Sequence, residues 1–170
     1  MSGCYKGHGL GRELLEHCLE DAREYHGVVS VAGRSPYLTD TRFYLHQGFE
    51  VVASTETGYD LVCYRGDPEA PLPRFAENAR CGTVPEDQGV HFEYVSQCPF
   101  VPGCLRGLSA VARGLGLEAT ERELTREDAQ NAASPFDTFG AFFHGRLVTH
   151  ELMSEEKFRL LLERELEQVG

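Results

Sequence analysis

A stretch rich in proline divides the chain and places the strongest constraint on its fold. Residues 67–85 combine scattered charges with Pro68, Pro71, Pro73 and Pro85. Proline lacks a backbone N–H and fixes φ, so prolines at this density prevent a long helix or a central strand. We therefore expect a linker over residues 67–85, with one folded unit over 1–66 and another over 86–170. A chain of 170 residues is long enough for two small domains.

The segment before the linker alternates between helical and strand patterns. A helix is predicted just after Gly11, because apolar residues recur there at helical spacing, and this stripe is expected to face a core. Its members are Leu14, Leu15, Cys18, Leu19 and Ala22. The β-branched run 28–32 predicts a buried strand, and the pattern that follows predicts a short helix over 41–47 and strands over 49–53 and 59–64.

The segment after the linker has the same mixed character. A strand is predicted over 91–95, a helix over 105–115 and a short helix after the capping-box pattern 125–128. His144-Gly145 is typical of a two-residue hairpin turn between strands over 138–143 and 146–150, and Ser154 is expected to cap a last helix. Both segments therefore predict an α/β fold class.

Composition and charge exclude several kinds of partner and site. The 27 acidic and 16 basic residues give a formal net charge of -11, so the chain lacks the basic surface that nucleic acids or anionic membranes attract. We find no apolar run long enough to span a bilayer and no signal-peptide pattern, and we expect a cytoplasmic protein. The six cysteines form no C-x-x-C pair and are read as reduced thiols, and no metal site is predicted from the spacing of histidines and cysteines.

A glycine-rich loop opens the first predicted helix. It reads Lys6-Gly7-His8-Gly9-Leu10-Gly11. Glycines let a backbone approach a ligand closely, and the free amide groups at a helix N-terminus favour a pyrophosphate. Taken alone, the same pattern also fits a flexible entry turn.

This loop resembles the acetyl-CoA-binding signature of the GNAT acetyltransferases, Gln/Arg-x-x-Gly-x-Gly/Ala. A second family segment, Phe-Tyr-x-x-x-Gly-Phe, is matched by residues 43–49 about 35 positions downstream. The resemblance implies acetyl-CoA as donor, residues 6–11 as its binding loop and an amine on a small molecule or peptide as acceptor. It also implies that Tyr44 protonates the departing CoA sulfur. The structural alternative for Tyr44 is a half-buried aromatic residue on a short helix.

The resemblance to the GNAT family starts at the glycine loop, although the family has further strands and helices before it. We therefore expect a partial GNAT-like mixed sheet with flanking helices over residues 1–66. Either the sequence is a fragment, or another chain supplies the remaining strands. An exposed sheet edge seeks a strand, so we expect a homo-oligomer or a partner that completes the sheet.

Cys98 lies between a predicted strand and a predicted helix. Backbone dipoles at that position stabilise a thiolate, which favours a reactive cysteine; the alternative is a small residue at a tight turn. The pattern from 86 to 170 resembles a small thioredoxin-like domain, with Ser134-Pro135 near the place of that fold's cis-proline. Over the segments 90–100, 129–136 and 145–152, the chain resembles the C-terminal part of the YoaP-like proteins, in which a GNAT domain precedes such a domain. The alternative to acetyl transfer is a non-enzymatic thioredoxin-like module that binds a thiol or a metal.

Overall fold

The structure is a computed structural model that describes residues 7–33, 38–86, 88–136 and 138–169. The chain divides into two compact units. The first unit comprises residues 1–54 and 58–75, and the second unit comprises 55–57 and 76–170. Each unit contains one sheet with flanking helices, so the α/β class predicted from the sequence is confirmed.

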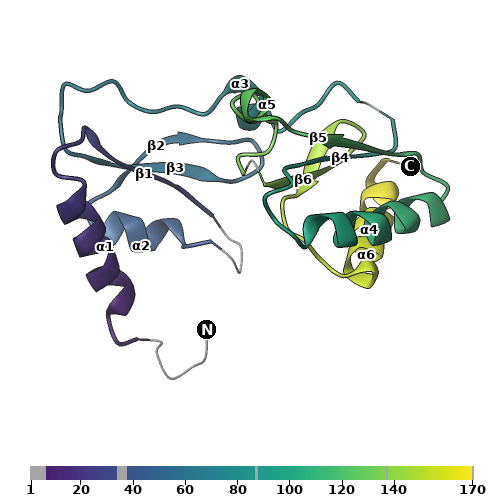
Figure 1. The fold of residues 1–170 in the computed structure, drawn as a ribbon, viewed down its shortest axis with the longest axis horizontal. Helices are drawn as coiled ribbons and strands as arrows, with labels where there is room; N and C mark the ends of the chain where they lie inside the picture. The colour runs from purple at the N-terminus through teal and green to yellow at the C-terminus, as the bar shows by residue number, and fades with distance from the viewer. Residues whose placement is uncertain (1–6, 34–37, 87, 137, 170) are drawn as a thin grey trace. The chain divides into compact units, whose positions relative to one another are not determined.

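The first unit is built on a three-stranded antiparallel sheet. Its elements are α1 (Leu10–Asp21), β1 (Gly27–Ala32), α2 (Thr41–His46), β2 (Glu50–Ser54) and β3 (Asp60–Arg65). The strand order is β1-β3-β2, so β3 lies in the middle and pairs with both neighbours. Both helices lie on the same face of this sheet (Figure 1).

The core of the first unit is small. Its fully buried members are Ala32, Phe49 and Val62, against which Leu15 and Leu19 of α1 pack only in part. The prediction that the whole apolar stripe of α1 faces the core is wrong for Leu14 and Cys18. Leu14 is 73% exposed, and Cys18 is also exposed. The apolar stripe is wider than the surface that the described sheet offers, so α1 buries no residue completely.

The second unit is built on a four-stranded mixed sheet of order β5-β4-β6-β7. Its elements are α3 (Glu77–Cys81), β4 (Val90–Tyr94), α4 (Val101–Gly114), β5 (Ala119–Glu123), α5 (Arg126–Ala129), β6 (Phe139–Phe143), β7 (Arg146–Thr149) and α6 (Glu155–Val169). β4 runs parallel to β5 and antiparallel to β6, and β7 is antiparallel to β6.

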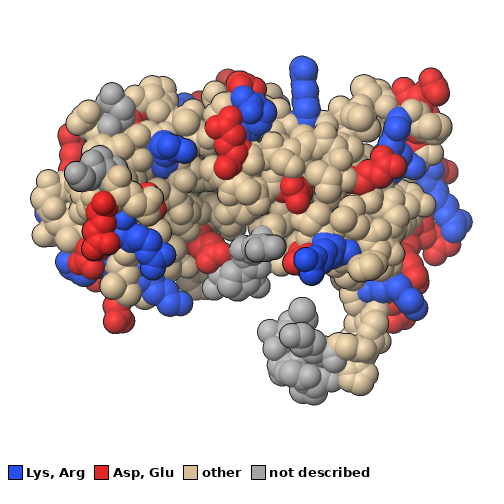
Figure 2. Space-filling view, turned by 180° about the vertical axis from the view of Figure 1, so that it is seen from behind, with Lys and Arg blue, Asp and Glu red and all other residues tan. Residues whose placement is uncertain are grey.

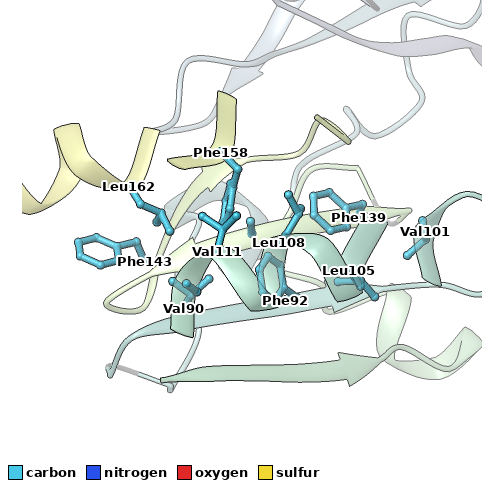
Figure 3. Packing of buried hydrophobic residues seen from close by; sticks show 12 residues of the cluster. Val90, Phe92, Val101, Leu105, Leu108, Val111, Phe139, Phe143, Phe158 and Leu162 are labelled. Carbon is cyan, nitrogen blue, oxygen red and sulfur yellow. The ribbon is translucent and has the colours of Figure 1, made fainter. Parts of the chain in front are cut away.

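Aromatic and aliphatic side chains fill the core of the second unit on the face covered by α4 and α6 (Figure 3). Phe92 of β4 is fully buried, with its ring centroid 6.2 Å from that of Phe139 and 5.8 Å from that of Phe158. Leu108 of α4 and Leu162 of α6 are also fully buried. Truncating a buried phenylalanine of this kind costs about 3–5 kcal/mol, so this cluster dominates the stability of the unit.

Two local predictions in the second unit are confirmed in detail. His144 and Gly145 have φ values of 45° and 77°, the left-handed backbone that a two-residue hairpin turn requires. Thr125 and Asp128 form a reciprocal capping box at the start of α5. These signals are local, which is why the sequence reveals them.

Acidic and basic side chains are interspersed on the face shown in Figure 2. None of the helices in the described ranges combines the length and apolar character needed to cross a membrane.

Candidate functional site

The glycine loop forms a tight turn that leads directly into α1. Gly7 and Gly9 have φ values of 88° and 78°, a left-handed backbone that favours glycine, and exposed His8 lies between them. The carbonyl of Gly9 accepts hydrogen bonds from the amides of Arg12 and Glu13 at 3.0 and 3.1 Å, which starts the helix. Lys6, the first residue of the predicted signature, lies outside the described residues.

The space around this loop suits an approaching anion. A Cβ atom added to Gly7 or Gly9 would have no other atom within 4 Å, so both backbones border open space. The amides of Leu10 and Gly11 precede the first hydrogen bond of α1, and the helix dipole adds partial positive charge there. A phosphate group fits these donors, whereas the Glu13 carboxylate in the first turn opposes it.

The second predicted motif lies next to the first turn of α1. A methyl group at Gly11 would lie 3.7 Å from Cζ of Phe43, the residue before Tyr44 on α2. The fold therefore brings together two segments that are about 30 residues apart in the sequence. Asp40 caps the N-terminus of α2, and its carboxylate accepts a hydrogen bond from the Arg42 amide at 2.8 Å.

Tyr44 is half-buried and held on three sides. Its ring contacts Phe43 and Phe49, with centroid separations of 5.6 and 5.1 Å. Its hydroxyl lies 2.9 Å from the hydroxyl of Ser30 on β1, and either oxygen can donate. The aromatic packing fixes the ring, and the hydrogen bond fixes the hydroxyl.

Ser30 was missed by the sequence analysis. In β1 it alternates with Val28 and Ala32, so these three residues share the face that α1 and α2 cover. A hydroxyl at the middle of an otherwise apolar inner face needs a partner. This alternation is the signal that identifies Ser30 as a partner for a polar side chain above the sheet.

Cys98 belongs to the second unit, whereas Tyr44 belongs to the first. Cys98 is half-buried against the core cluster, and its carbonyl accepts a hydrogen bond from the Val101 amide at 3.2 Å. Its thiol makes no hydrogen bond within the described ranges. The peptide bond before Pro135, which the resemblance places near the cis-proline of the thioredoxin fold, is trans.

A pocket of about 670 Å³ lies at the carboxyl ends of the parallel strands β4 and β5. The polar residues that line it are Ser96, Gln97, Thr125, Arg126, Gln130 and Thr138, beside Val95 and Leu124. The Arg122 guanidinium donates a hydrogen bond to the Asp128 carboxylate at 2.7 Å, whereas the Arg126 guanidinium has no partner among the described residues. Carboxyl ends of parallel strands commonly hold ligands, and Gln97 places this pocket one residue from Cys98.

Other polar groups in the second unit serve its structure. The buried Ser109 hydroxyl donates to Glu121 at 2.6 Å, which ties α4 to β5. Burial raises the pKa of the Cys104 thiol, which donates a hydrogen bond to the Met153 carbonyl at 3.5 Å. Over the ranges that the structure describes, no three His, Cys, Asp or Glu side chains gather closely enough to hold a metal ion.

Comparison with known proteins finds similarity to a family model and to a named relative. A family model described as YoaP-like matches residues 124–159, from the end of β5 into α6. The chain is also 33% identical over 167 residues to a protein from Bacillus subtilis (strain 168) named uncharacterized N-acetyltransferase YoaP. The match covers 95% of this chain and 66% of that relative, so the chain spans just under two thirds of its length. No solved structure matches. The chain is thus similar in sequence to a protein named as an N-acetyltransferase.

Proposed function

We propose that the chain takes part in acetyl transfer from acetyl-CoA to an amine, with the first unit holding the donor. The observation that carries this proposal is the nearness of Gly11 to Phe43, whose Cζ lies 3.7 Å from where a Cβ of residue 11 would be, because it places the glycine turn beside the helix that bears Tyr44. Similarity to a protein named as an N-acetyltransferase supports the same reaction class. We assign residues 6–11 to donor binding, with Gly7, Gly9 and the amides of Leu10 and Gly11 facing the pyrophosphate.

The reaction is an attack by a neutral amine on the thioester carbonyl. A bond forms between nitrogen and the acetyl carbon, the carbon–sulfur bond breaks, and the nitrogen loses a proton to solvent. Tyr44 gives its hydroxyl proton to the departing sulfur and regains a proton from solvent, while Ser30 donates a hydrogen bond to the phenolic oxygen in between. Ser30 is in this scheme a positioning residue.

The acceptor is an amine on a small molecule or a peptide, and nucleic acid and membrane are not its source. The net charge of -11 supports this choice, since it favours cationic amines over polyanions. The strand order β1-β3-β2 and the order of glycine turn, helix, strand and tyrosine-bearing helix support a GNAT-like assignment of the first unit.

Titration calorimetry with CoA tests donor binding directly. The chain should bind CoA. When acetyl-CoA is added together with diamines, amino acids or short peptides, the chain should release free CoA, which chromatography detects. The Gly9→Asp variant, which should bind CoA weakly, is the matched negative control. Absence of CoA binding by the folded wild-type chain at millimolar concentration would refute the proposal.

A second candidate function rests on the pocket beside Cys98. The strand order β5-β4-β6-β7, with a parallel pair joined through α4, supports a thioredoxin-like assignment of the second unit. The polar residues of the lining and the Arg126 guanidinium, which has no partner among the described residues, suit a ligand with a carboxylate. On this alternative the second unit binds a thiol-bearing ligand without acetyl transfer. Mass spectrometry would then find a mixed disulfide on Cys98 after incubation with small disulfides.

A further inference from the structure

The side chain of Thr41, the first residue of α2, is hydrogen-bonded to the sheet of the first unit. Its hydroxyl donates to Oδ2 of Asp60 at 2.8 Å. Asp60 is the first residue of β3, the strand that pairs with both of its neighbours. The other carboxylate oxygen, Oδ1, accepts a hydrogen bond from the Ser54 hydroxyl at 2.7 Å. Both oxygens of Asp60 are therefore engaged, which fixes the plane of the carboxylate.

Asp60 lies on the same face of the sheet as Ser30, the partner of Tyr44. In the antiparallel pair of β1 and β3, Ala32 is opposite Asp60 and Ser30 is opposite Val62. Opposite residues of such a pair share a face, and so do residues two positions apart on one strand. Ala32 and Val62 belong to the buried cluster under the helices. Asp60 and Ser30 therefore lie on this covered face, diagonal to each other across the two strands.

Two hydroxyl groups of α2 match these two positions on the sheet. Thr41 and Tyr44 are three residues apart, so their side chains lie on one side of the helix, with Cβ atoms about 5–6 Å apart. The Thr41 hydroxyl bonds to Asp60, and the Tyr44 hydroxyl bonds to Ser30. One hydrogen bond would still let the helix turn about it. Two bonds to two strands fix both the rotation of α2 and its position along the sheet.

The placement of α2 depends on these bonds because the helix is short. It has six residues, and isolated helices of fewer than about 12 residues are marginal in water. None of its six residues is fully buried, so apolar packing holds it less firmly than it holds α4 or α6 in the second unit. The hydrogen bonds of Thr41 and Tyr44 therefore account for a large part of its fixed orientation.

We propose that Asp60 is a positioning residue, which aims the Tyr44 hydroxyl by holding the first turn of α2 through Thr41. Its effect on a rate rests on the proposed role of Tyr44 in acetyl transfer. A general acid must lie within hydrogen-bond reach, about 2.6–3.2 Å, of the atom that it protonates. A displacement of about 1 Å can slow a reaction about 10²-fold, so a loosened first turn of α2 should lower turnover.

Steady-state kinetics with acetyl-CoA tests this role in matched variants. Thr41→Val removes the hydroxyl at nearly constant shape and should lower turnover about tenfold or more, and Asp60→Ala should do the same. Thr41→Ser keeps a hydroxyl, and Ser54→Ala removes only the other hydrogen bond of Asp60. Both of these controls should stay close to wild type. CoA affinity, measured by calorimetry, should be unchanged in all four variants, because the glycine turn is intact.

A double-mutant cycle separates positioning from general damage to the unit. Tyr44→Phe leaves no phenolic hydroxyl to aim, so adding Asp60→Ala to it should lower turnover little further. If Asp60 only stabilised the fold, the two losses would multiply. Losses that multiply, an unchanged rate in Thr41→Val and Asp60→Ala, or an equally large loss in either control would overturn the proposal.

Nuclear magnetic resonance of ring-¹³C-labelled tyrosine gives a readout that does not depend on acetyl transfer. Tyr44→Phe identifies the Tyr44 resonance among the seven tyrosines, and Ser30→Ala shows how its Cζ shift responds to loss of their hydrogen bond. Thr41→Val and Asp60→Ala should move the resonance in the same direction, whereas Thr41→Ser should not. An unmoved resonance would overturn the proposal. A moved resonance in a chain that transfers no acetyl group would support positioning by Asp60 and refute only the proposed function.

Discussion

The hydroxyl of Tyr44 lies 2.9 Å from that of Ser30, which ties the middle of α2 to the inner face of β1. The bond spans two elements of the first unit and sits beside the small buried cluster of Ala32, Phe49 and Val62. A half-buried phenol with one fixed partner retains a defined direction for its proton. Removing the hydroxyl of Tyr44 while keeping its ring therefore tests a chemical role separately from a structural one.

Replacing Tyr44 with phenylalanine should lower turnover of acetyl-CoA by about 10²–10⁴-fold, the range for loss of a general acid. CoA affinity should stay within about twofold, because the ring contacts with Phe43 and Phe49 remain. Steady-state kinetics and calorimetry measure the two quantities. Ser30→Ala, which leaves the phenol in place, should cost less turnover. Equal turnover in Tyr44→Phe and wild type would exclude the proton-transfer role.

Replacing Gly9 with aspartate should weaken CoA binding at least tenfold, because its carboxylate enters the open space beside the first amides of α1. Gly9→Asn is the control, since asparagine has nearly the same shape and both residues tolerate positive φ better than most. Calorimetry should find the asparagine variant close to wild type. Equal loss in both variants would point to backbone strain instead of charge.

Cys98 should react with iodoacetamide before Cys18 near pH 6.5. Both are accessible in part or whole, but Cys98 lies just before the N-terminus of α4, a position where reactive cysteines commonly occur. Cys63 and Cys104 should react last, because burial raises the pKa of each thiol. Peptide mapping after brief alkylation gives the order. Faster labelling of Cys18 would mean that Cys98 is only a small residue in a turn.

His150 should make the second unit less stable in mild acid. Its ring stacks on Phe136 with a centroid separation of 4.2 Å, and burial lowers its pKa, offset in part by the Glu151 carboxylate. The unfolded histidine binds its proton at higher pH, so this stability is complete above about pH 6.5, declines as the pH falls from there towards the lower folded pKa, and changes no further below that pKa. The free energy of unfolding declines by less than about 1.4 kcal/mol per pH unit.

Urea unfolding at pH 7.5 and 5.5 measures this effect. His150→Gln should reduce the difference between the two free energies of unfolding. His144→Asn, at the exposed hairpin turn, should leave the difference unchanged, because asparagine accepts the φ of 45° found there. The same pH dependence in His150→Gln and wild type would contradict the assignment.

The sequence predicts best those features that depend on neighbouring residues. The hairpin turn at His144 and the capping box at Thr125 were found because a few adjacent residues determine each. The exposure of Leu14 and Cys18 was not found, since periodicity identifies an apolar face without stating what covers it. Covering surfaces come from distant segments.

The candidate site divides in the same way. The glycine turn and Tyr44 were identified from their sequence pattern, and their roles in acetyl transfer stay predictions. Ser30 and Arg126 were not identified, because the first matters through a partner on α2 and the second through a pocket between loops. Only the tertiary arrangement places such residues beside a site.

The late position of α6 in the chain sets an order of events during synthesis. Phe158 and Leu162 are fully buried, so the core of the second unit stays open until both have left the ribosome. The sheet of the first unit is complete at Arg65, about 100 residues earlier. At bacterial and eukaryotic elongation rates this interval lasts about 5 to 20 s. Throughout it, the first unit can fold while the core of the second unit is still open.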